Sequence, residues 1–331
     1  MKLRAISIIR DEIDIVSLFL RHLDALFDEV ILLDHQSMDG TTELLRQAVA
    51  QRPMWKYYRV DIKQKFQEQL MNFFLEKFRT DKFDYLFFLD GDEFIWVKNR
   101  QALENLLNLN QDEIGVYGLQ WVNCVPKRLN ATKPLDANTE LCISREPGGW
   151  QKIAVNWNQV DTSDLRVNEG NHSAFHLDGQ SYPNSKIGKL VHIPIRSKKQ
   201  LASKALLSRC SMLLEAKRNP GASFQFNRFV EKIARNELTD SDLLRFIYYY
   251  QLGDNSIPEG WENEFMDQCT VQKIKKAGIA LSDQLKLKMP KHLPTMEQKI
   301  ANALSNASII DPNTCTIMLK DETISLGTVS Q

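Results

Sequence analysis

The sequence of 331 residues lacks a long apolar run and an excess of charge of either sign. No apolar stretch reaches the roughly 18–20 residues that a membrane-spanning helix needs. Residues 1–10 alternate charged and apolar side chains, which argues against a secretory signal. Basic and acidic residues number 42 each, so broad capture of nucleic acid or of an anionic membrane is not expected. We therefore expect a cytoplasmic protein without a nucleic-acid partner, with a peripheral position at a membrane as the alternative location.

Cysteine is also scarce, and the cysteines share no short spacing. They are Cys124, Cys142, Cys210, Cys269 and Cys315. Their number is odd and no C-x-x-C motif occurs, so neither a disulfide framework nor a zinc site is indicated. We expect buried, reduced thiols.

The N-terminal part of the chain alternates between short apolar runs and segments with helical spacing. Strands are expected over residues 3–9, 30–33, 55–60 and 85–89, and helices over residues 11–27, 41–49 and 64–78. Such strand–helix alternation predicts the α/β class, with a mostly parallel sheet and helices on both faces. In sheets of this kind, ligands bind beyond the carboxyl ends of the strands.

A different pattern follows residue 110. Strands are expected over residues 114–125, 140–144, 152–157 and 187–195, helices over residues 200–216, 224–236 and 241–251, and a small hairpin over residues 314–326. We therefore divide the chain into a domain of residues 1–196, with halves 1–110 and 111–196, and a mainly helical C-terminal region of residues 197–331.

Two carboxylates follow the most apolar of the expected strands. Asp90 and Asp92 come after residues 85–89, and Gly91 between them lets the backbone bend so that both acids face one side. Clustered carboxylate oxygens suit Mg²⁺ or Mn²⁺ better than zinc. An ion held there would bind a diphosphate and stabilise its charge as it leaves. The alternative is an ordinary strand-to-loop junction with solvated acids.

A second polar cluster follows the strand expected at residues 30–33. Asp34 lies where this strand leaves the sheet, and its carboxylate can accept hydrogen bonds from a ribose hydroxyl or a base N–H. Asp39 and Gly40 turn the chain, and Thr41 begins the next helix. A well-capped loop without a ligand is the alternative for this segment.

Taken in order, these motifs resemble the family 2 glycosyltransferases. The motifs are Ile8-Ile9-Arg10-Asp11-Glu12, Asp34-x-x-Ser37-x-Asp39-Gly40-Thr41 and Asp90-Gly91-Asp92-Glu93-Phe94. They are most similar to the branch with a D-x-D-E-F core, itself similar to family 92, although Arg10-Asp11 stands where Lys-Asn is more usual. The resemblance covers about residues 3–205. It implies a GT-A-like, Rossmann-like fold and the transfer of a sugar from a nucleoside-diphosphate sugar to an acceptor hydroxyl.

The resemblance also implies roles for individual residues. Asp90 and Asp92 match the motif that binds the diphosphate and its metal, Mn²⁺ or Mg²⁺. Asp34 matches the position that recognises the nucleoside, and Glu12 matches the acid of the first loop. The acceptor is left open between a glycan, a lipid-linked molecule and another hydroxyl compound.

Residues 1–110 would then bind the nucleotide and residues 111–196 would form the acceptor side. Within the second half, Gly170-Asn171-His172 resembles a Gly-x-His segment of the same branch, and His172 is a candidate metal ligand. His192-Ile193-Pro194-Ile195-Arg196-Ser197, followed by Lys204, also resembles it. Arg196 and Lys204 are candidates to neutralise a diphosphate, and solvent-facing positions are the alternative for both.

An inverting transfer needs a general base beside the acceptor hydroxyl. Asp92 and Glu169 are the catalytic candidates, with Asp161 and Asp178 as alternatives to Glu169 for the base. Trp150 and Trp157 are candidates to stack on a sugar face or to pack in the core.

Two other classes of function fit part of the pattern. A phosphatase of the haloacid dehalogenase type also ends a strand in D-x-D, with the first acid, here Asp90, as nucleophile. In that class the motif follows the first strand, whereas here three strand units precede it. A non-catalytic module that binds a nucleotide sugar is the other alternative.

Overall fold

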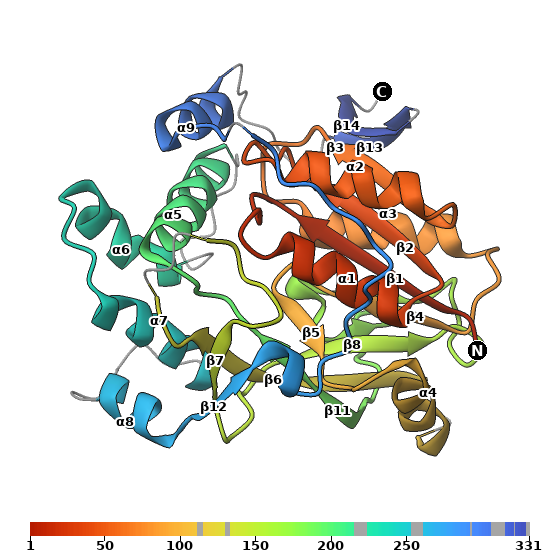
Figure 1. Cartoon of the computed structure of the whole chain (residues 1–331). Helices are drawn as coiled ribbons and strands as arrows, with labels where there is room; N and C mark the ends of the chain where they lie inside the picture. Colours follow the sequence, from red (N-terminus) through yellow and green to blue (C-terminus); the bar gives the residue numbers. More distant parts are fainter. Residues whose placement is uncertain are drawn as a thin grey trace.

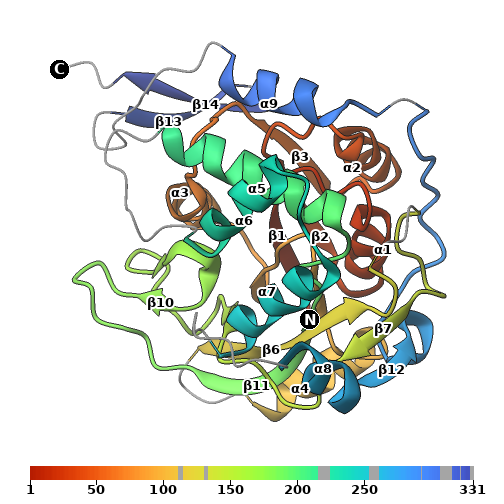
Figure 2. The ribbon, with the colours of Figure 1, turned by 90° about the vertical axis from the view of Figure 1, so that its left-hand side faces the viewer.

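The computed structural model describes residues 1–110, 115–129, 133–214, 224–252, 261–291, 293–305, 315–320 and 322–328. Its centre is a large sheet with the path β12-β7-β6-β8-β4-β1-β2-β3-β14-β13, to which β11 and β5 also pair. Figure 1 shows this sheet on one side and the helices α5, α6 and α7 gathered on the other, and Figure 2 turns that helical side toward the viewer.

The N-terminal half follows the predicted strand–helix alternation. Its strands are β1 (Leu3–Ile9), β2 (Glu29–Asp34), β3 (Trp55–Val60) and β4 (Tyr85–Phe88), and its helices are α1 (Val16–Leu26), α2 (Thr41–Gln51) and α3 (Gln67–Phe78). The neighbouring strands β3, β2, β1 and β4 run parallel. The α/β class and the parallel arrangement of this half are confirmed.

Helices cover both faces of the parallel strands. Apolar residues of α1 and α2 belong to one core cluster, which includes Phe19 and Leu44. Those of α3 belong to another cluster on the opposite face, with Leu70 and Phe74. Alternate residues of the strands divide between the two clusters, as the period of two along a strand requires. Burial on both faces therefore explains the successive apolar residues of β2 and β4, whereas β3 carries exposed Lys56 and Arg59.

The second half of the sheet is mixed rather than parallel. It contains β5 (Glu93–Ile95), β6 (Val116–Pro126), β7 (Glu140–Ile143), β8 (Gln151–Asn156) and β11 (Ser185–His192), and α4 (Arg100–Leu109) lies between β5 and β6. β8 runs antiparallel to both β4 and β6, whereas β11 runs parallel to β6. Two short strands, β9 (Arg166–Val167) and β10 (Ala174–Phe175), flank the one-turn helix η1 (Glu169–Asn171).

The expectation of a mainly helical C-terminal region is wrong in part. Helices α5 (Lys198–Leu213), α6 (Phe224–Ala234), α7 (Asp240–Leu252), α8 (Trp261–Gln268) and α9 (Met296–Leu304) are present, with strands β12 (Thr270–Lys273), β13 (Cys315–Lys320) and β14 (Thr323–Thr328) and the short helix η2 (Ile274–Lys276). β12 pairs with β7, and β14 pairs with β3, so both ends of the sheet are extended by this region. β12 has only four residues and none of them is buried. The sequence therefore has no apolar run that predicts this strand.

The hairpin predicted over residues 314–326 is present as β13 and β14, which pair antiparallel. Residue 314 itself lies outside the described residues, as do residue 114 and residues 215–216 at the ends of other predicted elements. Within the described parts of the chain, no helix is long and apolar enough to cross a membrane.

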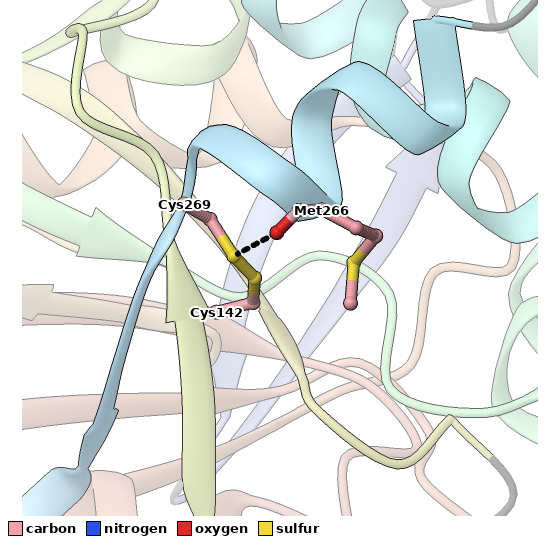
Figure 3. The surroundings of a disulfide bond; sticks show 3 residues. All are labelled: Cys142, Met266 and Cys269. Atoms are coloured by element: carbon pink, nitrogen blue, oxygen red, sulfur yellow. Dashed lines mark hydrogen bonds between the residues drawn. A yellow bond between two sulfur atoms is a disulfide. The ribbon is translucent and has the colours of Figure 1, made fainter.

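The expectation of reduced thiols is wrong for two of the cysteines. Cys142 of β7 and Cys269, just after α8, form a disulfide with a Cα–Cα distance of 5.4 Å, and Cys269 Sγ lies 3.3 Å from the carbonyl oxygen of Met266 (Figure 3). The pairing of β12 with β7 brings these cysteines together across 127 positions, which their spacing did not indicate. Cys124 and Cys210 are buried free thiols, as expected.

Candidate functional site

A cleft of about 620 Å³ opens beyond the carboxyl ends of β1 and β4. The loop after β1, the turn after β4, the segment around η1, the end of β11 and one side of α5 all contribute to its walls. Residues of the predicted site that line it are Glu12, Asp90, Asp92, Glu169, His172 and Lys204. The fold thus brings together side chains that are far apart in the sequence, as the α/β rule for ligand sites predicts.

Asp90 lies at the floor of this cleft, two residues after β4. Its Oδ2 is 2.6 Å from the Lys152 ammonium, and its Oδ1 accepts a weak hydrogen bond from Gln67 at 3.3 Å. The Glu93 carboxylate accepts a hydrogen bond from the Asp90 backbone N–H at 2.9 Å. Glu93 therefore holds the turn that carries Asp90 and Asp92.

Two cations and a neutral histidine surround Asp92. The Lys204 ammonium donates to its Oδ2 at 2.9 Å, an Arg196 nitrogen lies 3.8 Å from the same oxygen, and His192 Nε2 lies 4.0 Å from Oδ1. Burial alone raises the pKa of this carboxyl, but the charges of Lys204 and Arg196 outweigh burial and hold the pKa below its ordinary value. Asp92 is therefore a carboxylate at any physiological pH.

Lys152 is the main cation that sequence reasoning missed. Its side chain is fully buried, and its ammonium contacts Asp90, Glu93 at 3.6 Å and the carbonyl oxygen of Gly170 at 2.8 Å. It also ties the turn after β4 to the segment at η1. The only sequence signal was the strand period, which places Lys152 on the same face of β8 as the buried Ala154.

Arg196 is buried away from the cleft surface. Its guanidinium forms a two-pronged contact with Asp14 at 2.9 and 3.0 Å, contacts Glu12, and donates to the carbonyl oxygen of Ile193 at 3.0 Å. Arg196 is not among the residues that line the cleft. It orders the loop after β1 and contributes charge beside Asp92.

Glu12 lines the cleft between Arg196 and Lys204, whose ammonium lies 3.9 Å from its Oε1. Burial raises the pKa of Glu12 to about 7, although the charges of Arg196 and Lys204 oppose that rise.

Asp34 is buried beneath the second loop and does not line the cleft. Its carboxylate accepts hydrogen bonds from the Ser37 N–H at 2.9 Å, the Thr42 hydroxyl at 2.6 Å and the Tyr57 hydroxyl at 3.0 Å. These bonds order the loop after β2. A direct contact between Asp34 and a nucleoside stays a prediction.

His172 faces the cleft from the end of η1. Its Nδ1 lies 2.6 Å from the carbonyl oxygen of Gln151, so Nδ1 carries the proton and Nε2 keeps a lone pair. Burial, with the charge of Lys152, lowers the pKa of His172 to about 4, and the ring is neutral at pH 7. Gly170 has a φ of +79°, and the His172 ring lies where a side chain at this glycine would be.

Glu169 lines the cleft and forms an ion pair with Lys65, at 2.9 Å. The other two base candidates lie elsewhere. Asp161 accepts hydrogen bonds from Ser163, and Asp178 accepts one from the backbone N–H of Gln180; neither lines the cleft.

The residues at the floor of the cleft suit a hard divalent cation. Asp90 and Asp92 each use one oxygen for a lysine. The other oxygen of Asp90 accepts the weak hydrogen bond from Gln67, and His172 lines the same cleft. Within the described ranges, no three acids, histidines or cysteines are grouped closely enough to hold a metal alone. Mg²⁺ and Mn²⁺ commonly bind through one or two carboxylates together with substrate phosphates, so the donor set fits an ion that enters with a diphosphate.

The comparisons with known proteins bear on the same part of the chain. The model of glycosyl transferase family 2 matches residues 13–164, which include Asp34, Asp90 and Asp92. No curated protein matches the chain.

The chain is also similar to several solved structures. One is a mycobacterial protein (16% identity, TM-score 0.33, covering 64% of this chain and 74% of the other). Another is glucosyl-3-phosphoglycerate synthase from Mycobacterium tuberculosis, solved with Mn²⁺, UDP and glucosyl-3-phosphoglycerate (12% identity, TM-score 0.31, 63% and 77% covered). A third is the bifunctional glycosyltransferase WbbM (10% identity, TM-score 0.29, 92% and 50% covered). Scores this low carry no argument about the site, so the assignment rests on the family model.

Proposed function

As this chain is an enzyme of glycosyl transferase family 2, matched over residues 13–164, we propose that it transfers a sugar from a nucleoside-diphosphate sugar to an acceptor hydroxyl in the cleft. The observation that carries this proposal is the position of Asp90 and Asp92. Both line one cleft at the carboxyl ends of the parallel strands, beside cations that come from other elements.

The cations of the cleft suit a diphosphate. On the cleft, the Lys65 side chain is exposed and the Lys204 side chain is partly exposed, and Arg10 from the loop after β1 lines the cleft too. A developing diphosphate charge is stabilised most by cations that are already in place when the bond breaks. Lys204 is held by Asp92 and Glu12, so its ammonium needs little reorganisation to reach a phosphate oxygen.

Asp90 and Asp92 would hold Mn²⁺ or Mg²⁺ through the oxygens that do not contact the lysines, together with oxygens of the diphosphate. Ligation by His172 stays a prediction, because His172 is not grouped closely enough with the two aspartates to form a three-residue metal site with them. Such an ion neutralises the leaving diphosphate when it is bound. Lys152 and Lys204 fix the rotamers of the two aspartates, so the free oxygens are oriented before any ligand arrives.

Glu169 is our candidate for the general base. Of the three acids weighed for this role it is the one that lines the cleft. Its carboxylate is paired with Lys65, and proton transfer from an acceptor hydroxyl requires that this pair open or that the second oxygen be used.

A thermal-shift screen of nucleoside diphosphates with and without Mn²⁺ tests the proposal. We expect at least one nucleoside diphosphate to stabilise the protein, and Mn²⁺ to increase the shift. Asp92→Asn should remove the Mn²⁺-dependent part and abolish transfer. Full activity of this variant in chelator-treated buffer would contradict the role of the metal. Hydrolysis of p-nitrophenyl phosphate without nucleotide binding would favour the phosphatase instead.

A further inference from the structure

The wall of the cleft that comes from the second half of the sheet is aromatic. It consists of Trp121 of β6, Trp150 just before β8, His172, His192 of β11 and Tyr250 of α7. The rings are packed against one another. The Trp121 and His192 rings are stacked with centroids 4.0 Å apart, and the Trp150 and His172 centroids are 4.9 Å apart. Such a wall contrasts with the charged floor at Asp90 and Asp92.

Trp150 is the exposed member of this wall. It is 38% exposed, whereas Trp121 is 5% and His192 is 4% exposed. Trp157, the other tryptophan weighed for sugar contact, is buried in the core and stacked on Phe83. An indole left open on a cleft that also presents polar groups is a typical element of a ligand site.

The segment that carries Trp150 is held in place by its backbone. The Trp121 N–H donates to the Trp150 carbonyl oxygen at 2.9 Å, and the Gly148 N–H donates to the Trp121 carbonyl oxygen at 2.7 Å. The Gln251 side-chain amide of α7 donates to the carbonyl oxygens of Glu146 and Pro147, each at 3.1 Å. The backbone that carries the indole is therefore ordered before a ligand stacks on it.

Trp150 is linked by contacts to the floor of the cleft. Its ring packs on His172, which lies over Gly170, and the Gly170 carbonyl oxygen accepts from Lys152, the partner of Asp90. A molecule stacked on the indole therefore lies beside the groups that would hold the sugar diphosphate.

We propose that Trp150 is the stacking platform for a saccharide acceptor, so that the hydroxyl glycosylated belongs to a sugar ring. This inference rests on the proposed function. A pyranose presents an apolar C–H face to an aromatic ring and hydroxyls at its edge. The indole face matches the C–H face of the sugar. Its hydroxyls match the polar side chains on the same cleft, Asn168, Glu169 and Lys65. A lipid chain would need a continuous apolar lining, which these polar side chains interrupt.

Saturation-transfer NMR on the full chain with a panel of methyl glycosides tests the proposal. The probes are methyl glucoside, methyl mannoside, methyl galactoside and methyl N-acetylglucosaminide, with UDP, GDP and Mn²⁺ titrated separately by calorimetry. We expect at least one glycoside to bind. Trp150→Ala should weaken that binding about five- to tenfold, as loss of an aromatic contact does, and Trp150→Phe should retain most of it. Leu109→Ala removes an apolar side chain that is 83% exposed at the end of α4 and serves as the matched control.

The nucleotide titrations distinguish a failure of this inference from a failure of the proposed function. Trp150→Ala should leave nucleoside diphosphate affinity unchanged. If it weakens nucleotide binding instead, the indole stacks on the base and the acceptor proposal is overturned. It is also overturned if no glycoside binds the wild type, or if Trp150→Ala binds glycosides as the wild type does. Glycoside binding without any nucleotide binding would support the stacking of a saccharide on Trp150 and refute the proposed function.

Discussion

Replacing Lys152 with methionine tests the charge balance under the cleft. The ammonium of this fully buried lysine lies 2.6 Å from Asp90, 3.6 Å from Glu93 and 2.8 Å from the carbonyl oxygen of Gly170. Methionine keeps much of the length of the side chain but loses the charge and its hydrogen-bond donors. Glu93, whose side chain is also fully buried, then loses the one cation that forms an ion pair with it among the described residues.

The size of the effect follows from the burial of both partners. Burial raises the pKa of Glu93 well above its ordinary value even beside Lys152, and the lysine opposes that rise. Without Lys152, the pKa of Glu93 rises further. The Lys152→Met variant therefore keeps its folding stability at low pH and loses it as the pH increases. Removing one partner of a buried pair typically costs about 3–5 kcal/mol. Because Asp90 is one-third exposed and partly solvated, we expect the lower end, ~3 kcal/mol at about pH 8, and a clearly smaller loss at about pH 5.

Urea unfolding at both pH values measures this loss for the wild type, Lys152→Met, Glu93→Gln and the double variant. Removing both charges should restore a large part of the stability that Lys152→Met loses, because a neutral amide then replaces the buried Glu93 carboxyl and only the partly exposed Asp90 lacks its cation. Lys186→Met, on the exposed face of β11, is the matched control and should change little. A single variant as stable as the wild type at about pH 8, or a double variant without recovery, would refute the reasoning.

Two further predictions concern the loop after β2. Burial raises the pKa of Asp39 from 3.8 to about 6, so folding stability should fall as the pH rises from about 4 to 6. At about 1.4 kcal/mol per pH unit the fall attributable to this group is at most ~3 kcal/mol. Asp39→Asn should flatten that part of the stability curve in thermal unfolding, and an unchanged slope would exclude Asp39 as its source. Asp34→Ala removes the acceptor of the Tyr57 hydroxyl and the closer of the two acceptors of the Thr42 hydroxyl, so we expect a loss of ~1–3 kcal/mol in unfolding free energy. We predict a similar loss in nucleotide binding. Calorimetry that finds the nucleotide affinity unchanged would remove Asp34 from the binding site.

The parallel half of the sheet was predictable because each of its elements carries its own signal. Strands β1, β2 and β4 are buried on both faces, and apolar residues dominate each of them. The helices between them repeat apolar residues at helical spacing, and α3 buries Leu70, Phe74 and Phe78 as expected. The position of Asp90 at the end of the fourth strand followed directly from this order.

The ion pairs under the cleft were not predictable in the same way. Lys152 meets Asp90 across 62 positions, and Arg196 meets Asp14 across 182. A single lysine or arginine beside an apolar run is equally compatible with an exposed strand edge, because the sequence does not say which elements pack against it. β12 and the disulfide at Cys142 escaped prediction for the same reason, since both depend on the pairing of strands that are distant in sequence.

Some cations of the site lie beyond the part of the chain that the family model matches. The match ends at residue 164, whereas Arg196 and Lys204 come from the segment that leads into α5 and from α5 itself. Lys299 of α9 lies 3.8 Å from Asp11 and 3.9 Å from Asp39, so the last described helix also reaches the loops beside the cleft. Without these residues, buried acids of the matched part would have lost their counter-charges, which is costly in a protein interior. Of the two D-x-D carboxylates, Asp92 therefore receives its closest cation, Lys204, from the C-terminal region, whereas Asp90 is paired with Lys152 of the matched part.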